Sequence, residues 1–514
     1  MTEDHAMRAK SPRFSFLLKI GVTIALVAAF DWLFPNTIEG VSVGIFALAW
    51  LLAVILARPV VRHPRLDVAI ALALAAIFSL ALGYDPRPLP LFLFLCALSV
   101  ATLLPRTAGF DDAWRWTVRL MLHGATGAIK PVADLVRLLA TRPRGKRRTL
   151  KSLVGILALP LFGTLVFTIL FANANPLIAD ALSRLELPSP GKLVEWAFAT
   201  FLVWPMLRPH RIVTRLKIPD PAIDLPGTSL ASALIALTLF NMLFAVENGL
   251  DIAFLWSGAP LPAGMSMADY AHRGAYPLIA TALLAGLFVL TMLRPGTASA
   301  ANPWARRLVA LWVAQNLFLV ASSALRTIDY IQAYDLTALR IAALLWMALV
   351  AIGLILICWR LWMARSARWL INANALAAAL VLIPCCFVDL DASAAQWNVR
   401  HAREVGGASQ AIDLCYLRGL GAPALLPLIE LEQRPLPPAL ADRVRYVRAD
   451  ILSSLAGKQA HWWSWTAHDA LRLGAARRLL GPDPQQPLST RPGYNRTCSG
   501  TIARAPILTE APAQ

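Results

Sequence analysis

Long apolar segments separated by short polar links run along most of the chain. About eleven of them approach the roughly 20 residues that a helix needs to cross a hydrocarbon core. This pattern predicts an all-α fold, a polytopic transmembrane helix bundle. The predicted spans are a first run ending at Phe34, then Gly40–Ala57, Leu66–Gly83, Pro88–Leu104, Ser152–Phe171, Lys192–Leu207, Ser229–Glu247, Ala275–Leu293, Leu308–Leu325, Leu339–Trp359 and Trp369–Val388.

The composition supports a membrane protein. The chain is 58% hydrophobic and only 15% charged, whereas an ordinary soluble protein has roughly 25% charged residues. The net charge of +18 would favour a nucleic-acid partner if it belonged to a folded basic domain. Here the basic residues occupy links between apolar runs, so the lipid bilayer is the predicted partner and nucleic acid is excluded.

The basic residues also predict the orientation, because cytoplasmic links are enriched in Lys and Arg. Numbering the links alternately separates a strongly basic set from a weakly basic set. This contrast places the N-terminus in the cytoplasm and, with an odd number of spans, the C-terminus outside it. The basic set includes Arg58, Arg62, Arg65, residues 105–151, Arg208, Arg211, Arg215, Lys217, Arg294, Arg306, Arg307, Arg360, Arg365 and Arg368, and the other set has Arg87, Arg184, Lys192, Arg273 and Arg326.

Five regions follow from this pattern. They are four spans in residues 1–104, a basic amphipathic cytoplasmic loop in 105–151, a core bundle of seven spans in 152–388, an exported helical domain in 389–484, and a disordered tail in 485–514. Within the loop, Trp114, Val118 and Leu122 recur at helical spacing, as do Val132 and Leu135. Such helices either lie on an anionic leaflet or pack on neighbouring spans.

The exported region predicts a small extramembrane helical domain. Five helical stretches are separated by Gly and Pro, and Leu440, Val444 and Val447 belong to one apolar stripe. Cys415 and Cys498 both fall in this part of the chain. In an oxidising compartment, the sequence is compatible with either a disulfide between them or two free thiols.

One polar cluster interrupts the apolar pattern. The spans Leu308–Leu325 and Leu339–Trp359 flank a polar connection, Arg326–Ala338. Polar groups at membrane depth are costly unless paired, so they form a candidate functional site. The alternative is a hairpin whose arginines and aspartates neutralise each other at the lipid–water boundary. The candidate residues are Gln315, Asn316, Arg326, Asp329, Tyr330, Tyr334, Asp335 and Arg340.

No sequence motif predicts catalysis, a metal or a cofactor. The chain lacks HExxH, GxxxxGK[ST] and GxGxxG. His461 and His468 have no third ligand nearby, and zinc needs three or four. Asp389 and Asp391, just after the last span, are interpreted as a stop and helix cap rather than as an acid–base pair.

Three blocks resemble a known family. They are Ser322-Ser323-Ala324-Leu325-Arg326 with Tyr330-Ile331, Tyr334-Asp335-Leu336-Thr337, Arg340 and Trp346-Met347; Phe171-Ala172-Asn173-Ala174-Asn175-Pro176; and Val388-Asp389 with Trp397-Asn398-Val399-Arg400, Asp413-Leu414 and Tyr416-Leu417. Together they are similar to a bacterial multi-pass membrane family, domain of unknown function 4173, with the close relative 4153. The resemblance spans roughly Ser152 to Leu428, and the family pattern has Gly at the position of Asp335. It implies a bacterial inner-membrane protein without an assigned activity or catalytic residue.

Three functions fit these observations, and the first is favoured. A sensing or accessory protein would bind a protein partner or envelope ligand through the exported domain. A transporter would use the polar residues in the spans, although no internal repeat is evident. A lipid-linked transferase would use Asp329, Asp335 or Asp389, with arginines that hold phosphate.

Overall fold

The computed structural model describes residues 12–35, 37–58, 65–140, 188–216, 229–256, 301–407 and 409–504, with isolated positions between them. The chain forms two compact units. The first is Met1–Leu80, Phe92–Asp111 and Trp116–Lys217, and the second is Ala81–Leu91, Asp112–Arg115 and Ile218–Gln514. The predicted spans Ser152–Phe171 and Ala275–Leu293 lie outside the described residues apart from isolated positions.

Seven described helices are long and apolar enough to cross a membrane. Large apolar side chains on them stay exposed, including Ile24, Leu80, Leu243 and Leu380, each at least 64% accessible. A soluble protein would bury such faces, whereas lipid tails cover them at no cost. The chain is therefore a membrane protein, and its helices are consistent with the predicted all-α bundle. The seven helices are Phe16–Leu33, Leu66–Tyr84, Pro88–Arg106, Leu230–Asp251, Pro303–Tyr334, Ala338–Trp362 and Ala367–Cys385.

The first unit consists of helices with few charged side chains inside. Phe30, Phe46, Trp50 and Phe94 form a chain of ring contacts between α1, α2 and α5, with neighbouring centroids 5.4–6.0 Å apart. Its elements are α1 (Pro12–Leu33), α2 (Val41–Ala57), most of α4 (Leu66–Tyr84) and α5 (Pro88–Leu103), η1 (Leu104–Arg106), most of α6 (Ala113–Gly127), α7 (Lys130–Ala140), α10 (Pro190–Leu207) and α11 (Arg211–Arg215).

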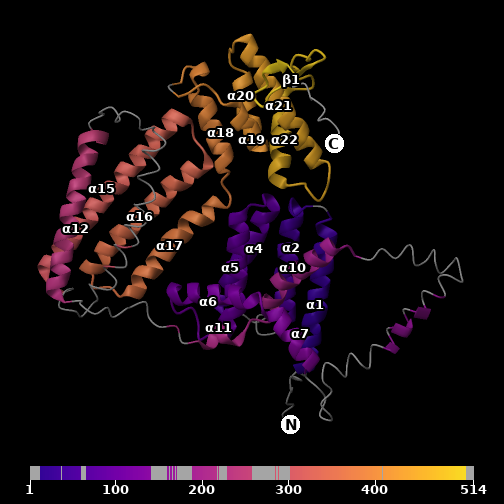
Figure 1. Ribbon diagram of the computed structural model, residues 1–514, viewed down its shortest axis with the longest axis vertical. Helices are drawn as coiled ribbons and strands as arrows, with labels where there is room; N and C mark the ends of the chain where they lie inside the picture. Colours follow the sequence, from indigo (N-terminus) through magenta and orange to yellow (C-terminus); the bar gives the residue numbers. More distant parts are fainter. Residues whose placement is uncertain are drawn as a thin grey trace, which may run out of the picture. The chain divides into compact units, whose positions relative to one another are not determined.

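Four neighbouring membrane helices belong to the second unit (Figure 1). Side-chain caps define where three of them start: Asn302 accepts from Trp304 N, Thr337 from Arg340 N and Ser366 from Trp369 N. The helices are α12 (Leu230–Asp251), which continues as the π-helix η2 (Ile252–Trp256), then α15 (Pro303–Tyr334), α16 (Ala338–Trp362) and α17 (Ala367–Cys385).

The predicted connection Arg326–Ala338 is mostly helical, so its boundaries were wrong. Helix α15 continues to Tyr334 because no Gly or further Pro interrupts the 32-residue run from Pro303. The turn to α16 contains only Asp335–Thr337. Asp335 has φ 65°, a backbone conformation that favours glycine, the residue that the resemblance implied at this position.

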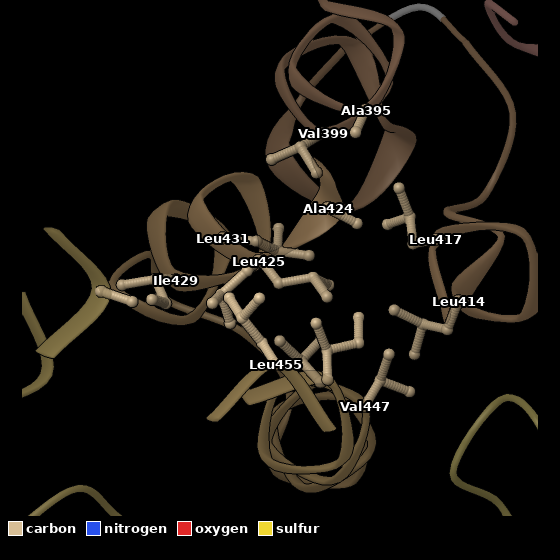
Figure 2. Packing of buried hydrophobic residues seen from close by; sticks show 14 of the residues in the cluster. Ala395, Val399, Leu414, Leu417, Ala424, Leu425, Ile429, Leu431, Val447 and Leu455 are labelled. Atoms are coloured by element: carbon tan, nitrogen blue, oxygen red, sulfur yellow. The ribbon is translucent and has the colours of Figure 1, made fainter. Parts of the chain in front are cut away.

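Five α-helices after α17 pack around a hydrophobic core (Figure 2). Ala395 and Val399 of α18 face Leu425 of α20 and Val447 of α21, all at most 1% exposed. The predicted stripe on α21 is confirmed at Val444 and Val447. The elements are α18 (Leu390–His401), η3 (Arg403–Val405), α19 (Leu414–Leu420), η4 (Ala422–Ala424), α20 (Leu425–Glu432), α21 (Pro438–Gln459) and α22 (Ala467–Leu480).

The segment predicted as a disordered tail has structure up to residue 504. Strands β1 (Tyr494–Arg496) and β2 (Ile502–Arg504) form an antiparallel hairpin, and Cys498 between them is disulfide-bonded to Cys415. Arg496 Nη1 donates to Asp442 Oδ2 on α21 at 2.8 Å. The disulfide and this buried ion pair hold the hairpin in place, although its polar composition would not fold by hydrophobic burial alone.

Candidate functional site

The predicted polar cluster does not form one site. Gln315 and Tyr334 are 19 residues apart on α15, and a helix rises about 28 Å over that length. The side chains divide between two places. Gln315 and Arg326 face α12, whereas Tyr330, Tyr334, Asp335 and Arg340 surround the turn between α15 and α16.

The first group forms a polar seam between α12 and α15. Gln315 Nε2 donates to Asn241 Oδ1 at 3.0 Å, and Asn248 Nδ2 donates to Gln315 O at 3.3 Å. Arg326 pairs with Asp251, which is 4% exposed. Asn316 donates to its own helix at Trp312 O. Asn241 also donates to Leu308 O. The contact of Asn248 with Gln315 therefore lies seven residues further along both helices, so α12 and α15 run parallel.

The second group closes the α15–α16 turn. Arg340 donates to the backbone carbonyls of Tyr334 and Asp335 and lies over the Tyr330 ring, 4.0 Å from its centroid. Burial and then the charge of Asp413 raise the pKa of the Asp335 carboxyl, although Arg340 opposes this. The two arginines therefore do not simply neutralise the nearby aspartates, as the alternative interpretation assumed. Asp329 is half-buried on α15.

A polar pocket of about 380 Å³ lies between the α4–α5 turn and the C-terminal helices. Its walls come from widely separated parts of the second unit. Charged groups of both signs line it, with a short backbone stretch at Gly419–Pro423. The charged lining residues are Asp85, Arg87, Asp389, Asp391, Arg418, Asp450, Lys458, Asp469 and Arg472.

Ion pairs connect the two sides of this pocket. Arg472 Nη2 donates to Asp389 Oδ2 at 2.5 Å, and Arg87 lies 3.5 Å from the same carboxylate. His468 Nδ1 is 2.9 Å from Asp85 Oδ2 and its ring stacks on Tyr84. Burial alone would raise the pKa of Asp85, but the hydrogen bond to His468 and the charge of Arg87 lower it. Asp389 also caps α18 through Ala392 N at 3.0 Å, as predicted.

Asp85, Asp389 and His468 have the geometry of a metal site. Their ligand atoms lie within 4.8 Å of one another. However, guanidinium groups of Arg87 and Arg472 already occupy these oxygens, and Arg472 Nη2 is 3.3 Å from His468 Nε2. Two fixed cations at these distances oppose a metal ion by Coulomb repulsion. The residues present fit an ion-pair network better than a metal.

Two charged groups in the pocket remain open to a ligand. In the part of the chain that the structure describes, no ion pair or hydrogen bond engages the Asp391 carboxylate or the Lys458 ammonium. Burial, followed by the charges of Asp389 and Asp85, raises the pKa of Asp391, while Arg87 opposes the increase. Because burial destabilises the charged form of this carboxylate, a cation that enters the pocket would stabilise it.

Sequence analysis recognised this site only in part. Asp389 and Asp391 attract attention because they follow the last span, and His468 was considered as a ligand. Asp85 and Arg87 stand in a short link with no other charge, and 383 residues separate Asp85 from His468. No local pattern indicates such a contact.

The comparisons with known proteins place the chain in a family. A model described as Domain of unknown function (DUF4153) matches residues 68–431. The chain belongs to this family. The resemblance found in the sequence is thereby confirmed, with DUF4153 rather than its relative 4173 as the match. No match is found among curated proteins, and none among solved structures.

The DUF4153 region supplies only part of the pocket lining. Asp85, Arg87, Asp389, Asp391 and Arg418 lie within residues 68–431. The remaining charged lining groups are on α21 and α22, which follow the matched region. The pocket therefore needs α21 and α22 as well as the family region, residues 68–431.

Proposed function

We propose that this DUF4153 protein is a multi-pass protein of a bacterial inner membrane that binds a small polar ligand outside the cytoplasm and acts as a sensing or accessory protein. The observation that supports this best is the mixed-charge pocket, in which the C-terminal helices meet a turn between two membrane helices. Binding there would change contacts on both sides of the pocket and so reach the membrane helices.

Contacts between links support the proposed topology. Arg87 Nη1 donates to Val388 O at 2.7 Å, and Leu336 N donates to Asn398 Oδ1 at 2.7 Å. Arg87 and Leu336 belong to links that the alternate numbering assigns to the outer side. Val388 ends the last predicted span at that side, and Asn398 lies in the predicted exported domain. Arg306 Nη2 donates to Leu361 O at 2.5 Å between two links assigned to the cytoplasm. The disulfide is a further argument, since such bonds persist in oxidising compartments.

The lining favours a ligand that carries both charges. Asp391 would accept from an ammonium group, while Lys458 would pair with a carboxylate or phosphate. The other lining arginines already pair with aspartates, such as Arg418 with Asp450 at 2.8 Å. We therefore propose a zwitterion such as an amino acid or short peptide as the ligand class.

The test uses the full chain in detergent and a panel of free amino acids and dipeptides as probes. We expect one of them to raise the unfolding temperature, because a ligand at 100 times its Kd adds about 2.7 kcal/mol to the stability of the state it binds. Asp391→Asn and Lys458→Ala should remove the shift. Arg477→Ala, an exposed position on α22 outside the pocket, is the matched control. Equal shifts in all variants, or none in the wild type, would contradict the proposal.

Orientation is tested separately. Alkaline phosphatase fused after Gln514 should be active, because this enzyme needs export to form its disulfides. A fluorescent reporter that matures only in the cytoplasm should be dark at the same position. The reverse result would refute an external pocket whatever the ligand.

Transport is the second candidate, and the α12–α15 seam favours it. Among the described residues, no hydrogen bond reaches the buried acceptors Asn248 Oδ1, Gln315 Oε1 and Asp251 Oδ2, and buried acceptors call for a partner such as water or an ion. The π-helix η2 starts directly after Asp251, and π-helical turns are frequent at functional sites. Uptake of a labelled zwitterion into proteoliposomes, lost in Asp251→Asn, would support transport, whereas binding without uptake would leave sensing as the function.

A further inference from the structure

An apolar groove of about 800 Å³ lies between α1, α7 and α10 in the first unit. Its lining includes Ile20, Ile24 and Val27 of α1, Leu135 of α7, and Phe201 and Trp204 of α10. Helix α1 is long and apolar enough to cross a membrane. A groove that runs along it would open to lipid rather than to bulk water.

Helix α7 presents its apolar side outward. Lys130 and Asp134 are 5% and 3% exposed and form an ion pair at 2.5 Å, whereas Leu135 and Val136 are 55% and 58% exposed. A helix on a water-facing surface would have the opposite arrangement. The polar side of α7 packs on α10, which fits the packing alternative, while its exposed apolar side is what a helix on a leaflet would turn toward lipid.

Positive charge gathers around Asp134, which lines the groove beside Trp204. Lys130, Arg137 and Arg208 all lie within 4 Å of the single carboxylate of Asp134, at 2.5, 3.9 and 3.4 Å. Trp204 Nε1 donates to the same carboxylate at 3.0 Å. Lys130 and Arg208 alone outnumber this carboxylate, and the resulting excess of positive charge is complementary to a negatively charged headgroup.

The groove continues from this cationic end toward Asp31. The carboxylate of Asp31 pairs with Lys192 at 3.0 Å and accepts from Trp196 Nε1 at 3.1 Å. From Phe16 to Asp31, α1 rises about 22 Å, which covers most of a hydrocarbon core of roughly 30 Å. A long acyl chain has room along this wall.

We propose that the groove binds one anionic phospholipid from the leaflet on the cationic side. Its acyl chain lies along α1 and α10, and its phosphate lies beside Lys130, Arg137 and Arg208. This inference does not depend on the polar pocket or on its ligand, since it uses only residues of the first unit.

The experiment is native mass spectrometry of the full chain after exchange into phosphatidylglycerol or phosphatidylcholine. We expect the wild type to retain one phosphatidylglycerol and to lose phosphatidylcholine. Ala28→Trp fills the groove and should abolish retention, and Arg137→Gln should weaken it. Ala25→Trp is the control, because Ala25 is exposed on the same helix but does not line the groove.

Two results would overturn the proposal: equal retention of both lipids, or unchanged retention in Ala28→Trp. A second measurement needs no variant in the groove. A photoactivatable phosphatidylglycerol should label peptides of α1, α7 and α10 in the wild type. If a crosslinker placed at position 28 instead reaches residues 141–189 of the same chain, the groove is filled by protein and the lipid site does not exist.

Discussion

Removing the disulfide between Cys415 and Cys498 should loosen the hairpin without unfolding the C-terminal helices. The two cysteines are 83 residues apart in sequence, for which the chain-entropy model gives about 4.5 kcal/mol of stabilisation at 25 °C. Measured disulfides usually contribute roughly 2–4 kcal/mol. The hairpin keeps its ion pair between Arg496 and Asp442 at 2.8 Å, and neither cysteine is among the core residues of α18–α22.

The assay is hydrogen exchange of full-length protein in detergent. A loss of 2–4 kcal/mol corresponds to an increase of about 30- to 900-fold in the open population, seen as faster exchange in peptides covering β1 and β2. Cys415→Ser with Cys498→Ser is compared with Cys96→Ser, a cysteine outside any disulfide. Unchanged exchange in the double variant, or alkylation of both cysteines in the wild type without reductant, would refute the reasoning.

Three further changes have defined outcomes. Asp251→Asn should destabilise the chain by about 3–5 kcal/mol, because it leaves the Arg326 cation buried with a weakened partner; thermal unfolding should show partial recovery when Arg326→Gln is added, and no loss would contradict the pair. The pKa of Asp391 is raised in the folded state, so its ionisation at neutral pH destabilises the fold. Asp391→Asn should therefore raise the unfolding temperature at neutral pH, and the gain should vanish below about pH 4, the pKa in the unfolded chain. A pH-independent difference in unfolding temperature would refute this prediction. Gly500→Ala should speed proteolysis of the hairpin, because its added Cβ lies 2.9 Å from a carbonyl oxygen on α21, whereas Gly493→Ala, also at positive φ but with open space, should show less effect.

Hydropathy predicted the membrane helices well because their boundaries coincide with changes in polarity. The helix from Ala338 to Trp362 and the predicted span Leu339–Trp359 differ by a few residues. The same rule failed where a polar stretch stays helical, since Arg326 satisfies its charge on Asp251 of another helix. Polarity indicates where a chain leaves lipid only when no neighbouring span supplies a partner.

The polar pocket was not predictable for a different reason. Its central contact joins Asp85 to His468 across nearly the whole family region. Each residue alone resembles an ordinary cap or surface group, and Asp389 does serve as a cap. The hairpin after Gln485 was missed similarly, because Arg496 and Cys498 are ordered by partners at Asp442 and Cys415 rather than by local pattern.

Contacts and charges bear on the topology independently, and their agreement strengthens the proposed arrangement. Arg106, which follows α5, donates to the backbone carbonyl of Pro209, which follows α10, at 2.8 Å. Two links in contact lie on the same side of the membrane, so the chain between Arg106 and Pro209 crosses the membrane an even number of times. The predicted span Lys192–Leu207, which lies on α10, would supply one crossing, and the predicted span Ser152–Phe171, outside the described residues, would supply the second. Lys and Arg counts led to the same parity without reference to any contact. An arrangement that omitted this span would force Arg106 and Pro209 to opposite faces of the membrane, where their hydrogen bond is impossible.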